Sequence, residues 1–122
     1  MQITKEYLQK HPNHVFVFGD NLLHKGYGGA ASLRDMHNTA GFITKKYPNN
    51  QPDSFYTVDE YKSVYKREIH VLQQDVEQHP NDLFLITKIG SGLANRWGIF
   101  EKIIKPNIKK DLAKYSNVRF LW

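Results

Sequence analysis

Two glycine-rich turns hold the residues that could carry chemistry in this chain. Each turn follows an apolar run typical of a buried strand, over residues 15–18 and 83–87. Their sequences are Gly26-Tyr27-Gly28-Gly29-Ala30-Ala31 and Gly90-Ser91-Gly92-Leu93. Glycine lets backbone N–H groups approach an anion closely, and a following helix adds the positive end of its dipole. Because loops at the carboxyl ends of parallel strands share one edge, we expect a joint cradle for a phosphate or pyrophosphate.

The turns match none of the common phosphate-binding signatures. The first lacks the GxxxxGK[ST] pattern of a P-loop, and it also lacks GxGxxG with an acidic residue about 20 positions later. Glycines that only permit tight turns therefore remain the alternative. The six histidines show no metal-ligand spacing, so no metal site is predicted. No cofactor is predicted either.

The elements that must position these turns alternate between strand and helix patterns. Helices are predicted over 4–10 and 29–36, over a stretch that carries residues 61–76 and is ended by His79-Pro80, and over 97–114. Strands are predicted over 15–18, 41–46, 83–87 and 118–122. A capping box, Thr57 with Glu60, begins the third helix, and Pro106 predicts a kink or break in the last one. The alternation predicts an α/β protein, a single three-layer α/β/α domain over residues 1–122 with a mostly parallel, mixed sheet. Its N-terminal helix and turn occupy residues 1–13, and the motifs lie within 15–122. The long loop 46–55 is expected to rim a pocket.

The composition favours an anionic partner, because the net charge of the 122 residues is +5. Five lysines of the last predicted helix lie opposite its apolar residues, which is more typical of a solvated helix face than of a nucleic-acid surface. They are Lys102, Lys105, Lys109, Lys110 and Lys114. The chain has no cysteine and no membrane-length apolar run, which favours a cytoplasmic protein, or one of the host cytoplasm if it is viral. The sequence leaves the oligomeric state open.

In order and spacing, three motifs resemble the macrodomain superfamily. They are the first glycine turn, Phe42-Ile43-Thr44-Lys45-Lys46, and Ile89-Gly90-Ser91-Gly92-Leu93 with Trp97 beyond it. The most similar branch holds enzymes that remove ADP-ribose from glutamate and from DNA bases. The chain also resembles a short macro-like family of phages and bacteria. This resemblance implies a macrodomain-like fold and a pocket for ADP-ribose or a related nucleotide.

The resemblance also implies roles for particular residues. Gly28, Gly29 and Ala30 would lie beside the distal ribose and diphosphate, and Gly90, Ser91, Gly92 and Leu93 would form the second phosphate loop. Lys45 takes the position of the catalytic lysine. Asp20 and Asn21 are further ligand-binding candidates, although Asn21 could instead stabilise a turn. The base could stack on Tyr47, Phe55, Tyr56 or Trp97, which could equally be core residues.

One departure from that branch concerns its catalytic aspartate. Ala94 and Asn95 follow the second turn where the branch has an aspartate that assists the lysine, and Asp20 or Asp35 would have to replace it. We therefore predict a binder of ADP-ribose or a related nucleotide. The alternatives are a lysine-dependent hydrolase of ADP-ribosylated DNA or protein, and a small basic nucleic-acid-binding or interaction domain.

Overall fold

A computed structural model describes residues 2–122 and contains one four-stranded sheet. The strands are β1 (His14–Asn21), β2 (Thr39–Lys45), β3 (Leu83–Ile86) and β4 (Val118–Phe120), in the order β2-β1-β3-β4. Every neighbouring pair is parallel. The predicted α/β class is confirmed. A mostly parallel, mixed sheet was predicted, but its four strands are all parallel. The antiparallel pairing outside the named strands is an isolated bridge between Lys45 and Phe55.

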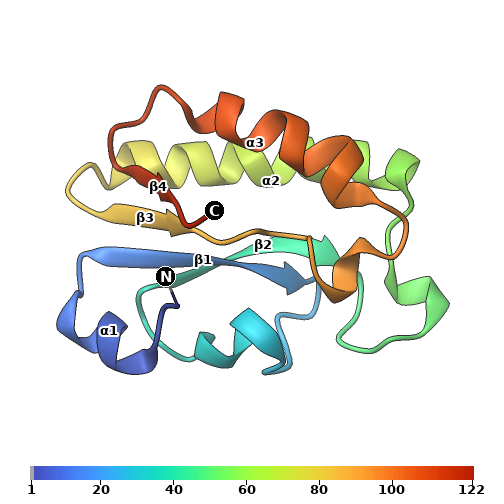
Figure 1. Cartoon of the computed structure of the whole chain (residues 1–122), viewed down its shortest axis with the longest axis horizontal. Helices are drawn as coiled ribbons and strands as arrows, with labels where there is room; N and C mark the ends of the chain where they lie inside the picture. Colours follow the sequence, from blue (N-terminus) through green and yellow to red (C-terminus); the bar gives the residue numbers. More distant parts are fainter. Residues whose placement is uncertain (1) are drawn as a thin grey trace.

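Helices cover both faces of the sheet, which gives three layers (Figure 1). The long α2 (Val58–Gln78) and α3 (Lys105–Leu112) lie on one face. The short α1 (Lys5–Lys10) and the 3-10 turn η1 (Gly29–Leu33) lie on the other. Two hydrophobic clusters follow from this arrangement, a large one under α2 and α3 and a smaller one between the sheet and α1.

The start and the buried face of α2 follow directly from the sequence. The Thr57 hydroxyl accepts from the Glu60 backbone N–H at 3.2 Å, and the Glu60 carboxylate accepts from the Thr57 N–H at 3.0 Å. This confirms the predicted capping box. The apolar residues at intervals of three and four are all buried against the sheet. They are Tyr61, Tyr65, Ile69, Leu72 and Val76, together with Val64.

The last helix begins later than predicted and contains a π-helical segment. Its first residues form η4 (Phe100–Ile104), in which the Lys105 N–H reaches the Phe100 carbonyl, and α3 continues from there. Pro106 has no N–H to continue a regular α-helical ladder, and the predicted kink or break takes the form of a change from π-helix to α-helix just before this residue. The five lysines of this helix are exposed, as expected.

The predicted helix over 29–36 is wrong, because η1 is a 3-10 turn of five residues. Short 3-10 turns also occur within the long loop, as η2 (Pro52–Ser54), and after the second glycine turn, as η3 (Leu93–Asn95). Residues 2–122 include no helix long and apolar enough to span a membrane.

Candidate functional site

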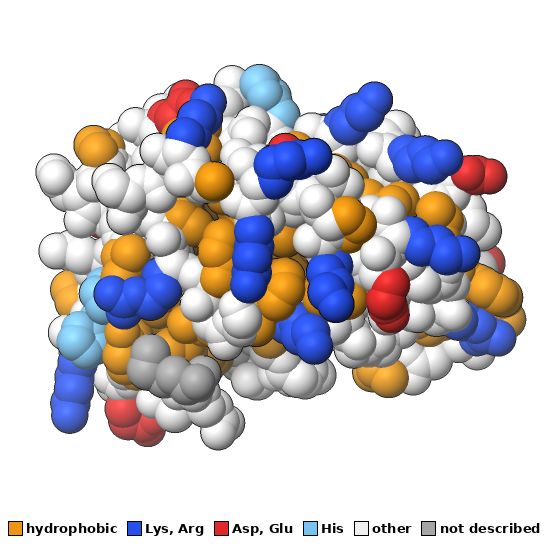
Figure 2. All heavy atoms as spheres, turned by 45° about the horizontal axis from the view of Figure 1, so that its top comes forward, with side chains coloured by type: hydrophobic (Ala, Val, Ile, Leu, Met, Phe, Trp, Pro, Cys, Tyr) orange, Lys and Arg blue, Asp and Glu red, His pale blue; other side chains and the backbone are white. Residues whose placement is uncertain are grey.

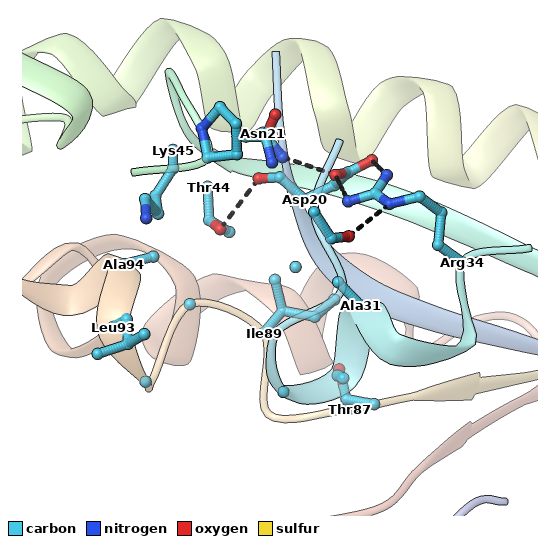
Figure 3. A pocket seen from close by; sticks show the side chains of 18 of the residues that line it. Asp20, Asn21, Ala31, Arg34, Thr44, Lys45, Thr87, Ile89, Leu93 and Ala94 are labelled. Carbon is cyan, nitrogen blue, oxygen red and sulfur yellow. Dashed lines mark hydrogen bonds and ion pairs between the residues drawn. The ribbon is translucent and has the colours of Figure 1, made fainter. Parts of the chain in front are cut away.

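A cavity of about 430 Å³ lies where the strand order reverses. From β1 the chain passes to β2 on one side and then to β3 on the other, so the carboxyl ends of β1 and β3 adjoin at a topological switch point. Ligands of open α/β sheets bind at such points. The ends of β1, β2 and β3 and the loops beyond them line this first cavity (Figure 3).

Both glycine-rich turns contribute to the first cavity. Of the predicted ligand-binding residues, all but one line it: Asp20, Asn21, Gly28, Gly29, Ala30, Gly90, Gly92 and Leu93. The exception is Ser91, whose hydroxyl donates to the Lys88 carbonyl at 2.6 Å. The two turns therefore meet at one cavity, as the expected cradle requires.

Backbone N–H groups of both turns are free to bind a ligand. Within residues 2–122, no protein acceptor receives a hydrogen bond from the N–H groups of Gly28, Gly29, Gly90 or Gly92. The free N–H groups of Gly28 and Gly29 are successive, which is the arrangement of an anion-binding concavity. In the second turn the Ser91 N–H, between Gly90 and Gly92, donates to the Lys88 carbonyl at 3.2 Å. The elements that follow are 3-10 turns of five and three residues, so the expected contribution of a helix dipole is wrong. The capacity to bind an anion comes from the loops themselves.

An ion pair fixes the shape of the first glycine turn. Arg34 donates to both carboxylate oxygens of Asp20, at 2.7 and 3.1 Å, and the Asp20 side chain is only 3% exposed. Arg34 also donates to the backbone carbonyls of Lys25 and Gly26, at 3.1 and 2.9 Å. One guanidinium thus ties the end of β1 to the loop that carries Gly28 and Gly29 (Figure 3).

The Asp20 carboxylate is fully engaged and is therefore a structural anion. Besides Arg34, it accepts from the Asn21 N–H at 2.8 Å and contacts His24 Nδ1 at 2.9 Å. Burial raises the pKa of Asp20, but the hydrogen bonds from Arg34, His24 and Asn21 outweigh it and leave that pKa below its usual value. A carboxylate held in this way is poorly suited to be the general base that the sequence left open.

Asn21 and Asp35 have similar local roles. The Asn21 amide donates to the Lys25 carbonyl at 2.8 Å, and its oxygen accepts from the Leu23 N–H at 3.0 Å. This is the turn-stabilising arrangement that the sequence offered as an alternative to ligand binding. Asp35 accepts from the exposed Tyr27 hydroxyl at 3.0 Å, and it does not line the first cavity.

The adjacent lysines Lys45, at the end of β2, and Lys46, just beyond it, have different surroundings. Lys45 lines the first cavity, where Nζ lies 3.4 Å from the Asn50 side-chain oxygen and 5.1 Å from the centre of the Phe55 ring. Burial lowers the pKa of Lys45. Lys46 is instead paired with Glu60 at 2.8 Å and does not line the cavity. Lys45 is therefore the residue of this pair that can meet a ligand.

Part of the loop 46–55 rims the cavity, as predicted, through Pro48, Asn49 and Asn50. The four aromatic residues proposed to stack on a base do not line it. Phe55 and Tyr56 are core residues, each 6% exposed, whereas Tyr47 and Trp97 are 41% and 47% exposed.

A family model matches residues 1–95, so the chain belongs to DUF7831, a family of unknown function. The matched segment includes β1, β2, β3 and both glycine turns. No curated protein and no solved structure matches the chain. The likeness to macrodomains stays a prediction from the motifs.

Proposed function

We propose that this member of DUF7831 binds ADP-ribose, or a related nucleotide-derived ligand, with the diphosphate in the first cavity. The observation that carries the proposal is the meeting of two glycine turns, with free backbone N–H groups, at the switch point of a parallel sheet. The motifs that resemble macrodomains supply the ligand class. The cavity volume, about 430 Å³, lies within the range of small-molecule sites.

The charges around the cavity support an anionic ligand. Lys25, Lys45 and Lys88 line it, and Asp20 is the one carboxylate among its lining residues within 2–122. Because Arg34 already neutralises Asp20, the lysines leave an uncompensated positive charge. A diphosphate would gain both this charge and charge-assisted hydrogen bonds from the loops.

Gly28→Val should abolish or strongly weaken nucleotide binding while the fold remains intact. Gly28 has φ −75° and ψ 141°, which any residue adopts, and an added Cβ would meet no atom within 4 Å. The new side chain would occupy space that the ligand needs, so we expect at least about a tenfold loss of affinity, equivalent to about 1.4 kcal/mol. Thermal shift with ADP-ribose measures it: wild type gains about 2.7 kcal/mol at a hundredfold excess over Kd, and the variant much less.

Gly28 is a cleaner test site than Gly90, although both line the cavity. Gly90 has φ +79°, and an added Cβ would lie 2.5 Å from Ile104 Cδ1. A side chain there would strain the backbone and disturb the core, so lost binding would not distinguish a blocked site from a damaged fold. Equal stabilisation of wild type and Gly28→Val by ADP-ribose would contradict the proposal.

Lysine-dependent hydrolysis of an ADP-ribosyl bond is the second candidate, because Lys45 lines the cavity and burial lowers its pKa. Binding ranks first because Asp20, the one carboxylate that lines the cavity among residues 2–122, is already engaged by Arg34. A nucleic-acid-binding domain is less well supported. In Figure 2 the lysine and arginine side chains on the α3 side are spread out, with hydrophobic atoms between them. Affinity for an oligonucleotide that falls steeply with salt, without a response to ADP-ribose, would favour it.

A further inference from the structure

A second cavity, of about 340 Å³, adjoins the first along the carboxyl edge of the sheet. The two cavities share four lining residues: Gly29, Ala30, Thr87 and Lys88. The first cavity lies over the ends of β2, β1 and β3, and the second continues to Leu121 and Trp122 beyond β4. Two of these four residues are small, since Gly29 has no side chain and Ala30 only a methyl group, so an elongated ligand would cross from one cavity to the other over them.

The second cavity differs from the first in chemistry. Its apolar lining comes from four separate parts of the chain: Ile3, Phe16, Leu33 and Leu121. Ile3 and Phe16 belong to the small core cluster, and Leu33 and Leu121 pack against it. Polar groups at this cavity include Gln2 and Ser32, and Lys88 is its one charged residue within 2–122. Apolar walls with a few polar groups are typical of small-molecule sites, and they suit a partly apolar group such as an aromatic base.

We propose that the second cavity binds the nucleobase of the ligand, and this rests on the proposed function of the first. A ligand with its diphosphate at the glycine turns would cross Gly29 and Ala30 and place its aromatic base against Phe16, Leu33 and Leu121. The predicted stacking residues Tyr47 and Trp97 line neither cavity, whereas this apolar space adjoins the diphosphate site directly. The ligand class is therefore a base-bearing nucleotide.

Ser32→Phe should weaken binding of base-bearing ligands selectively. Ser32 is exposed, lines the second cavity and does not line the first, so a larger side chain can fill that space without entering the core. We expect calorimetry to show at least about a tenfold loss of affinity for ADP-ribose and AMP, and an unchanged affinity for ribose 5-phosphate. Gly28→Val is the matched control, which should weaken all three.

Trp122 offers a readout that requires no change in either cavity. The chain has two tryptophans, and Trp122 lines the second cavity, so Trp97→Phe leaves it as the only reporter. ADP-ribose should change its emission, and saturating ribose 5-phosphate should not. Equal emission changes with both ligands would overturn the base site alone. The same conclusion would follow if Gly28→Val lowered the affinity for ADP-ribose and Ser32→Phe left it unchanged. No binding of any of the three probes to wild type would overturn both proposals.

Discussion

Arg34→Met should lower the free energy of unfolding by about 3–5 kcal/mol, the usual cost of leaving one partner of a buried ion pair alone. Asp20 is 3% exposed, and its carboxylate would lose both hydrogen bonds from the guanidinium. The carbonyls of Lys25 and Gly26 would lose their donor as well. Because Arg34 holds the first glycine turn, the variant should also bind ADP-ribose weakly. Chemical denaturation measures the first effect and calorimetry the second.

A double variant separates the buried charge from the lost packing. In Asp20→Asn/Arg34→Met the uncompensated carboxylate is gone, so the double variant should be more stable than Arg34→Met alone. Asp20→Asn keeps a side chain that can still contact His24 and the Asn21 N–H. Strictly additive losses of stability would show that the ion pair does not couple β1 to the loop.

The same carboxylate predicts a dependence of stability on pH. The pKa of Asp20 lies below its usual value in the folded protein, so the folded state favours the ionised form. This contribution is fully present above the unfolded pKa, about 4, and is lost as the pH falls through the lower folded pKa. Asp20→Asn should remove that part of the acid sensitivity.

The sequence predicted those features of the fold that are set by residues close together in the chain, such as the start and the buried face of α2. Thr57 and Glu60 fix the start of α2, and the apolar stripe of that helix identifies its buried face, because both depend on spacings of three or four. The helix expected over 29–36 is instead a 3-10 turn of five residues, and Arg34, directly after it, pairs with Asp20 at the end of β1. A buried aspartate at a strand end requires a partner, but spacing alone could not choose Arg34, 14 residues later.

The candidate site was predictable to a similar degree. The glycine turns and Lys45 could be recognised because each follows a strand, and parallel strands bring their carboxyl ends to one edge. The second cavity could not be predicted from the sequence, because its apolar lining residues come together only through tertiary packing. They are Ile3, Phe16, Leu33 and Leu121. Ser91 is the one predicted ligand-binding residue that does not line the first cavity, and its hydroxyl donates to the Lys88 carbonyl within the turn.

Lys45→Ala should weaken ADP-ribose binding by about 1.5–3 kcal/mol, the contribution of one charge-assisted hydrogen bond. This corresponds to roughly a tenfold to 150-fold rise in Kd. Lys46→Ala is the matched control, because it removes the same charge at the next residue, where the lysine is paired with Glu60 outside the cavity. Calorimetry should show little change for the control. Equal losses in both variants would mean that only the overall charge matters.

Lys45 also decides between a binding protein and a hydrolase. A lysine that attacks the distal ribose must be unprotonated and needs a nearby group to transfer protons. Burial lowers the pKa of Lys45, which meets the first need in part. The second is unmet within residues 2–122, since Asp20 is the one carboxylate that lines the cavity and it is bound to Arg34. We therefore expect wild type to bind ADP-ribosylated DNA or ADP-ribosylated glutamate peptides without releasing ADP-ribose. Chromatography of the reaction mixture would detect release, and release by wild type but not by Lys45→Ala would establish the hydrolase instead.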